Sequence, residues 1–170
     1  MKESEQRKIF NEWLDGHRAL LFKVIRSYAF STEDQNDLFQ EVCIQMFRSI
    51  PNFKGSSAVS TWLYRIALNT AIKWSTKEKK HIDGHQEVDK MGNVLVAKDE
   101  AEDERVSWLY EVIKKFNEID RSLTLLLLDG YSYKEMSDLM GISESNIGVK
   151  LHRIKKQLTE TSKSYEYDGV

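Results

Sequence analysis

The chain has 170 residues, of which 41% are hydrophobic and 31% are charged, and its formal net charge is −2. This composition is typical of a soluble, helix-rich chain of one ordinary or two small domains, and it excludes a disordered chain. The weakly acidic total argues against tight, unaided coating of DNA, because such binding grows with the number of cations presented to phosphate. It does not argue against DNA binding by local basic patches.

The sequence contains one proline and one cysteine, Cys43. Long stretches without turn residues, and the lack of strand-like alternation, predict an all-α fold. A single cysteine can form neither an internal disulfide nor a thiolate zinc cage, so we expect a reducing cytoplasm. The charged start of the sequence predicts no signal peptide, and the longest apolar run, near residues 125–128, is too short for membrane insertion.

Helical spacing of apolar residues predicts three helices before Pro51. The first two, marked by Ile9 to Leu14 and by Leu20 to Tyr28, are expected to be structural only. The third is expected to open at Ser31 or Thr32, with acidic residues in its first turn, where they suit the helix dipole. Its expected inward positions are Leu38, Val42 and Met46.

The other side of this third helix carries an acidic and amide patch beside an aromatic residue without an obvious internal partner. Such a patch suits a protein partner, although an ordinary solvated face is the alternative. The residues concerned are Asp37, Gln40, Glu41 and Phe47.

Residues 53–74 combine a small polar loop with a long helix that we expect to be capped by Ser60. The predicted buried side of this helix is Leu63, Ile66, Ala67, Thr70 and Trp74. Opposite, a polar stripe recurs at every fourth position over roughly 24 Å. Its members are Thr61, Arg65, Asn69, Lys73 and Lys77. Such a stripe beside aromatic residues suits single-stranded nucleic acid, although a solvated face with aromatic residues in the core is the alternative.

Helical periodicity fails between residues 81 and 105, where two glycines and an acidic block interrupt it. This profile is typical of a linker or an interaction segment. His81 and His85 lie four residues apart, but without further ligands nearby they do not predict a metal site. We therefore expect two small helical domains, at 1–80 and 106–162, a flexible acidic linker at 81–105, and a disordered tail at 163–170.

The second domain contains a predicted helix-turn-helix unit. Ser132 and Glu135 form a capping box, Gly141 permits a tight turn, and Ser143 caps the last helix. A recognition helix reads bases mainly through its N-terminal side chains, and later cations hold phosphates. The predicted readout residues are Ser145, Asn146, Val149 and Lys150, and the predicted phosphate contacts are His152, Arg153, Lys155 and Lys156. A helical bundle without a DNA role is the alternative.

Several of these runs resemble one family, the extracytoplasmic-function group of bacterial sigma factors. The matching motifs are Asp37-Leu-x-Gln-Glu41, Asn52-Phe53-Lys54-Gly55, Ser60-Thr61-Trp62-Leu63-Tyr64-Arg65-Ile66-Ala67 and Asn69-Thr70, and the helix-turn-helix at 132–158 looks like the family's second domain. The resemblance implies sigma region 2, a helical bundle, followed by region 4.

The resemblance also implies roles for residues. Asp37, Gln40, Glu41 and Phe47 are expected to contact core RNA polymerase. The minus-ten element, including a base flipped from the melted non-template strand, is expected to meet Asn52, Lys54, Ser56, Ser57, Thr61, Trp62, Arg65, Asn69 and Lys73. Region 4 is expected to bind the double-stranded minus-thirty-five element. Many members have an aromatic residue before Thr-Trp, where this chain has Val59 and Ser60. Without a ring on which the base could stack at that point, we expect the polar groups of the loop to contribute more to binding the flipped base.

The expected partners are thus core RNA polymerase and promoter DNA, and the resemblance leaves an anti-sigma factor open. A stand-alone helix-turn-helix regulator is the alternative function, but it would not need residues 37–41 or 53–74. An enzyme acting on nucleic acid would need a carboxylate cluster, a metal set or an activated nucleophile, and the sequence suggests none. We therefore expect no catalysis, cofactor or metal.

Overall fold

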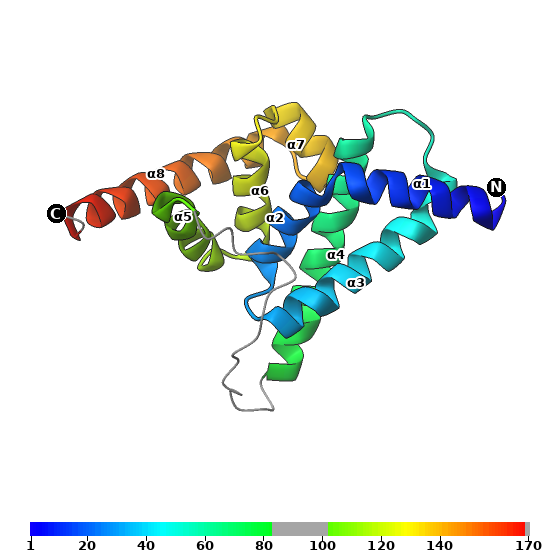
Figure 1. Cartoon of the computed structure of the whole chain (residues 1–170). Coiled ribbons are helices and arrows are strands. Elements are labelled where there is room, and N and C mark those ends of the chain that lie inside the picture. Colours follow the sequence, from blue (N-terminus) through cyan, green and yellow to red (C-terminus); the bar gives the residue numbers. More distant parts are fainter. Residues whose placement is uncertain (83–101, 169–170) are drawn as a thin grey trace. The chain divides into compact units, whose positions relative to one another are not determined.

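The computed structural model describes residues 1–82 and 102–168. Throughout these ranges the regular structure is helical. The chain divides into two compact units, Met1–Ala101 and Glu102–Val170, which we describe separately (Figure 1). Most of the predicted linker and the pair His81 and His85 lie outside the residues whose side chains are described.

Within residues 1–82, the first unit contains four α-helices and one short 3-10 helix. They are α1 (Glu3–Gly16), α2 (Arg18–Tyr28), α3 (Thr32–Ser49), η1 (Ile50–Asn52) and α4 (Val59–Ile82). The α3 helix begins as predicted, because the Ser31 hydroxyl accepts a hydrogen bond of 3.1 Å from the Asp34 N–H. Pro51 then lies in η1, where α3 has ended.

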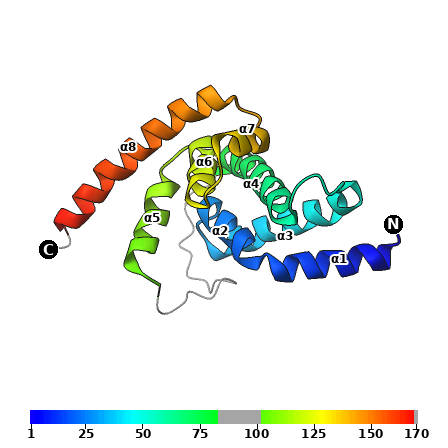
Figure 2. The same ribbon diagram turned by 90° about the horizontal axis from the view of Figure 1, so that it is seen from above.

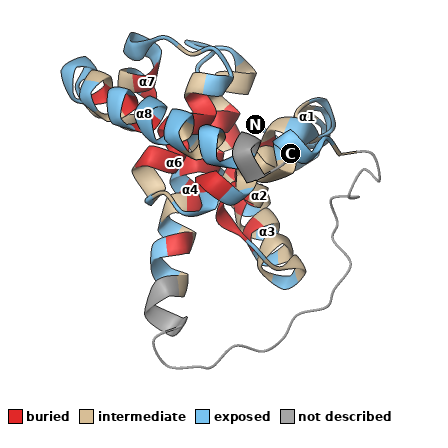
Figure 3. Cartoon of the chain, turned by 90° about the vertical axis from the view of Figure 1, so that its left-hand side faces the viewer, coloured by how far each residue is buried: buried red, intermediate tan, exposed pale blue. Residues whose placement is uncertain are grey.

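The core of the first unit lies where α2, α3 and α4 pack against one another (Figures 1 and 2). All three predicted inward positions of α3 are buried, as are Leu21, Val24, Ile25 and Tyr28 of α2. The buried side of α4 agrees with the prediction at Leu63, Ala67 and Thr70. Tyr64, Leu68 and Ala71 are buried as well, whereas Ile66 and Trp74 are only half-buried. Figure 3 colours the helices by the burial of their residues. The α4 helix is amphipathic because its outward positions are polar.

Two predicted boundaries of these helices are wrong. The α4 helix begins at Val59, and the Ala58 carbonyl accepts from the Trp62 N–H, so Ser60 lies in the first turn and is not the cap. The predicted disordered tail is helical through Asp168. Two kinds of contact support this end: Tyr165 packs against Trp108 of a preceding helix at 5.4 Å, and the hydroxyls of Thr159 and Thr161 donate to carbonyls one turn earlier.

The second unit contains α5 (Glu104–Lys114), α6 (Glu118–Leu128), α7 (Tyr133–Met140) and α8 (Glu144–Asp168). Its core is formed by buried leucines of α6 together with Met136, Ile147, Leu151 and Ile154. The predicted turn at Gly141 is confirmed, since Gly141 adopts a positive φ angle of 67°, and Gly130 after α6 does the same at 80°. Glycine reaches this left-handed region without a steric penalty, so it can end α6 and α7 sharply.

Candidate functional site

One face of α3 carries exposed groups that could contact another protein. Asp37 and Gln40 are exposed, and Glu41 is half-buried and accepts a hydrogen bond of 2.9 Å from Gln45 Nε2. Ile44, one turn further on, is an apolar residue that is 44% exposed. Helical spacing places these residues on one side. We call Asp37, Gln40, Glu41 and Ile44 the docking face.

Phe47, which the sequence predicts to be an aromatic residue without an internal partner, has one. Its ring meets the Phe10 ring edge-on at a centroid distance of 5.7 Å, and its carbonyl accepts a hydrogen bond of 2.7 Å from Gln6 Nε2. Phe47 therefore holds α1 against α3. The prediction failed because the partner lies on a helix far away in the sequence.

The loop between η1 and α4 is exposed, and its two ends are fixed by a cluster of aromatic rings. Phe53 at the start of the loop and Trp62 in α4 both pack edge-on against Trp13 of α1, at 5.1 Å and 5.4 Å. Phe53 and Trp62 lie 5.1 Å apart. Four predicted loop residues are exposed, namely Asn52, Lys54, Ser56 and Ser57. The cluster presents these polar groups on a rigid base, with Gly55 supplying a turn at φ 70°.

The polar stripe of α4 lies outward along most of its length. Arg65, Asn69 and Lys73 are exposed, as is Lys77, and Thr61 is half-buried. Thr70, next to the stripe, is buried and donates its hydroxyl to the Ile66 carbonyl at 2.7 Å. The stripe therefore offers cations and an amide in a row, which is the arrangement that tracks a nucleic-acid backbone.

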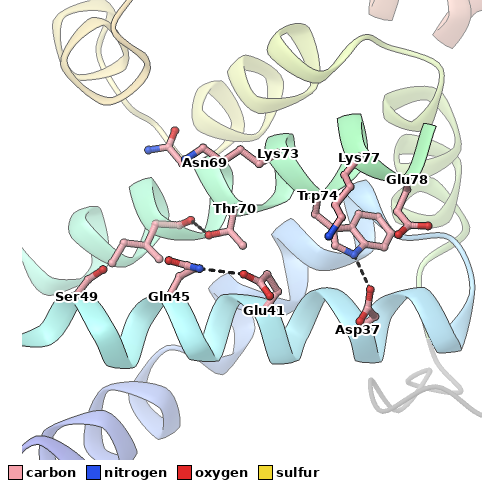
Figure 4. Close-up of a pocket in the computed structure, with 11 residues that line it drawn as sticks. Asp37, Glu41, Gln45, Ser49, Asn69, Thr70, Lys73, Trp74, Lys77 and Glu78 are labelled. Atoms are coloured by element: carbon pink, nitrogen blue, oxygen red, sulfur yellow. Dashed lines mark hydrogen bonds between the residues drawn. The ribbon is translucent and has the colours of Figure 1, made fainter. Parts of the chain in front are cut away.

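A groove of about 410 Å³ lies between α3 and α4 and joins the docking face to the stripe (Figure 4). Asp37 and Glu41 line it from α3, and Asn69 and Lys73 line it from α4. At one end the Trp74 indole Nε1 donates a hydrogen bond of 2.8 Å to Asp37 Oδ2. The two predicted surfaces are thus adjacent, and the groove takes lining residues from both.

In the second unit, α7 and α8 form the predicted helix-turn-helix. The Ser132 N–H donates to Glu135 Oε2 at 2.7 Å, and the Glu135 N–H donates to the Ser132 hydroxyl at 3.1 Å. The backbone hydrogen bond from Ser132 lowers the pKa of the Glu135 carboxyl. Ser143 caps α8 as predicted, because its hydroxyl accepts from the Asn146 N–H at 3.2 Å.

The outward side of α8 matches most of the predicted DNA-contacting set. Ser145, Asn146 and Val149 are exposed near its start, and Val149 is 69% exposed. Three later basic residues, His152, Lys155 and Lys156, are also exposed. Ile147, Leu151 and Ile154 are buried on the other side.

Two of the predicted α8 residues point to a partner within the unit. Arg153 Nη2 donates a hydrogen bond of 2.9 Å to Asp120 Oδ2, and Lys150 Nζ lies 4.0 Å from Asp120 Oδ1. Asp120 belongs to α6 and its side chain is only 7% exposed. Arg153 is exposed like its predicted phosphate-contacting neighbours, with 56% of its side chain accessible, but its guanidinium also donates to a buried carboxylate on a neighbouring helix.

Family models match both units. The Sigma-70 region 2 model matches residues 13–81, and the Sigma-70 region 4 model matches residues 109–158. Together they span well over half of the sequence. The chain belongs to the extracytoplasmic-function group of RNA polymerase sigma factors.

Individual relatives agree with this assignment. The chain is 27% identical over 164 residues to the ECF RNA polymerase sigma-E factor of Haemophilus influenzae, covering 89% of this chain and 86% of the relative. It is 25% identical over 146 residues to the RNA polymerase sigma factor YlaC of Bacillus subtilis, covering 81% and 83%.

Solved structures share the fold. The sigma factor RpoE of Bartonella quintana, in complex with the anti-sigma factor NepR, has a TM-score of 0.72 at 18% identity, covering 92% of this chain and 98% of that one. The protein CnrH, in complex with the cytosolic domain of CnrY, has a TM-score of 0.64 at 16% identity, covering 95% and 92%.

The alternative of a stand-alone helix-turn-helix regulator is not favoured, since such a regulator would not need the region 2 domain that the family model matches at residues 13–81. Sequence reasoning about this sigma factor missed Ile44 and Asp120. Ile44 falls at helical spacing from Asp37 and Gln40, so the periodicity of α3 could have identified it. Nothing in the sequence pairs Asp120 with a residue 33 positions later.

The described residues of this sigma factor contain neither a membrane-spanning helix nor a metal-binding cluster. Neither α4 nor any other helix within residues 1–82 and 102–168 combines the length and apolar character needed to cross a membrane. In the same ranges, His, Cys, Asp and Glu side chains form no group of three or more that could hold a metal ion. Burial raises the pKa of the Cys43 thiol, which makes it a weak nucleophile.

Proposed function

We propose that residues 1–80 of this sigma factor dock on core RNA polymerase and hold the melted minus-ten element, while residues 106–162 bind the double-stranded minus-thirty-five element. Residues 81–105 would connect them. The observation that carries the proposal is the groove in which the docking face and the α4 stripe meet, because it allows one small domain to contact polymerase and displaced strand together.

The docking face supplies the polymerase contact. Its carboxylates and amide provide directional interactions, and Ile44 provides the apolar centre that protein interfaces use. We assign Ile44 to this surface and leave Phe47 out of it, because the Phe47 ring is already packed against Phe10.

The loop and the stripe supply the minus-ten contacts. Exposed Asn52, Lys54, Ser56 and Ser57 offer donors and acceptors to a flipped base, and Arg65, Asn69 and Lys73 run beside the strand. Trp62 supports the loop from the aromatic cluster, and we assign it a positioning role instead of a stacking role.

The N-terminal half of α8 supplies the duplex contacts. Ser145, Asn146 and Val149 are exposed where a recognition helix reads base edges, and His152, Lys155 and Lys156 follow where cations meet phosphates. Gly141 fixes the turn that sets α7 and α8 against each other.

Energetics explain why this sigma factor works together with polymerase. Opening roughly ten base-pair steps costs on the order of 14 kcal/mol, at about 1.4 kcal/mol per step. Each captured base returns about 1–3 kcal/mol. The factor therefore nucleates melting, and the core enzyme completes it. We assign the factor no catalytic step of its own and place it in the cytoplasm with the polymerase.

An anti-sigma factor is a further proposed partner. RpoE and CnrH, whose folds are similar, were each solved in complex with a partner, NepR and the cytosolic domain of CnrY. A partner of this kind would compete with polymerase if it covered the docking face.

Run-off transcription with purified core polymerase on a promoter library tests the proposal. Asn69→Ala is expected to alter preference at minus-ten positions, and Asn146→Ala at minus-thirty-five positions. Asn11→Ala, an exposed amide on α1, is the matched control and should change neither. Unchanged promoter choice and yield for both test variants would show that the site assignments are wrong.

A further inference from the structure

The α8 helix is fixed to α6 by one buried carboxylate. Asp120 Oδ2 accepts hydrogen bonds from Asn117 Nδ2 at 3.0 Å and from Arg153 Nη2 at 2.9 Å. Asp120 Oδ1 is buried and has no hydrogen-bond partner among the described residues, and Lys150 Nζ lies 4.0 Å from it. Two cations of α8 thus converge on a single acid of α6.

Because the Asp120 carboxylate is buried, it needs a cation as a partner. The Asp120 side chain is 7% exposed, whereas that of Arg153 is 56% exposed. A buried carboxylate that loses its cation is strongly unfavourable, because water cannot replace the lost partner. If Arg153 turned away from α6 toward a phosphate, Asp120 would therefore lose its closest cation.

The position of Arg153 also fixes how α8 is rotated. Lys150 and Arg153 lie one turn apart, so they occupy the same flank of the helix. Anchoring this flank on Asp120 keeps Val149 and Lys156 on the side opposite the buried Ile147 and Leu151. A rotation of α8 would carry the readout residues away from the base edges.

We infer that Asp120 and Arg153 form a positioning pair that orients the recognition helix, and that Arg153 is not one of the phosphate contacts. Sequence readout then depends on this pair indirectly, while phosphate binding rests on His152, Lys155 and Lys156. The inference rests on the proposed function, in which α8 reads the minus-thirty-five element.

The test measures holoenzyme binding to duplex promoter DNA at several salt concentrations, with the full chain assembled on core polymerase. Each phosphate contact contributes about 0.9 to the slope of log K against log salt. We expect Lys156→Gln to lower this slope by about 0.9. Arg153→Gln should leave the slope unchanged while lowering affinity about threefold or more and weakening preference at minus-thirty-five positions.

A double-variant cycle supplies the second readout. Asp120→Asn and Arg153→Gln should cause similar losses of preference, and the double variant should be no worse than either alone, because both remove the same pair. If Asp120→Asn does not fold, as judged by circular dichroism, the salt slope of Arg153→Gln still decides the question.

Two results would overturn the inference in distinguishable ways. A slope reduced by about 0.9 in Arg153→Gln, as in Lys156→Gln, makes Arg153 a phosphate contact and leaves the proposed function intact. No change of slope in Lys156→Gln, together with unchanged preference in Asn146→Ala, removes α8 from DNA and overturns both proposals.

Discussion

The indole of Trp74 donates a hydrogen bond of 2.8 Å to the carboxylate of Asp37, 37 positions earlier in the sequence. Asp37 belongs to the docking face and Trp74 to the helix that carries the stripe. The bond therefore joins the surface proposed for polymerase to the surface proposed for the displaced strand. It lies at the end of the groove between α3 and α4 (Figure 4).

From this hydrogen bond we expect substitutions at its two ends to have different effects, one on the stability of the protein and the other on polymerase binding. Trp74→Phe keeps an aromatic ring but removes the donor, so the free energy of unfolding should fall by about 1 kcal/mol, as measured by urea unfolding. Asp37→Asn can still accept the indole N–H but loses its charge, so it should mainly weaken polymerase binding. Equal affinity losses in both variants would mean that the bond itself is needed for docking.

Ile44 and Phe47 should respond differently to substitution, although both are apolar residues of α3. Ile44→Ser changes an exposed position, so stability should stay within about 0.5 kcal/mol while polymerase affinity falls about tenfold. Phe47→Ala removes the contact with Phe10 and should destabilise the first unit by about 2 kcal/mol. Pull-down with core polymerase and thermal unfolding distinguish them. A strong affinity loss in Phe47→Ala at unchanged stability would restore the original assignment.

Lys73 should contribute to strand binding through charge. Lys73→Gln should lower the salt slope for binding of holoenzyme to a single-stranded minus-ten oligonucleotide by about 0.7, the value for one phosphate contact on a single strand. Lys8→Gln, an exposed cation on α1, is the control and should leave the slope unchanged. The stripe assignment fails if the two variants behave alike.

The capping box of α7 should lose strength in acid. Because the Ser132 N–H lowers the pKa of Glu135, the carboxylate stabilises α7 fully above its ordinary pKa of about 4.3, and this contribution is lost as the pH falls through the lowered value. The Ser132 amide resonance should titrate with a midpoint below that ordinary value. Glu135→Gln should abolish the titration, and a midpoint at or above the ordinary value would contradict the cap.

The sequence predicts well what depends on neighbours along the chain. Ser31 as a cap, the buried face of Leu38, and the stop at Gly141 follow from helical spacing and side-chain chemistry within a few residues. For the same reason the exposed stripe of α4 was predicted correctly. Its buried side was predicted correctly at Leu63, Ala67 and Thr70, but the contacts with α2 and α3 also cover Tyr64 and Leu68, which the spacing did not predict.

Sequence reasoning missed contacts whose partner is distant in sequence. Phe47 meets Phe10, and Arg153 meets Asp120, through contacts that only the folded unit creates. Periodicity assigns a residue to a face, but it cannot say which neighbouring helix covers that face. The helical end of α8 was missed for the same reason, since Tyr165 packs against Trp108.

Strand opening measured with and without core polymerase tests the central claim most directly. A fluorescent base analogue in the minus-ten non-template strand reports unstacking in real time. We predict negligible opening by the isolated sigma factor, clear opening by the holoenzyme, and reduced opening when the holoenzyme carries Asn69→Ala. Clear opening by the isolated protein, or equal opening by wild-type and Asn69→Ala holoenzymes, would contradict the account.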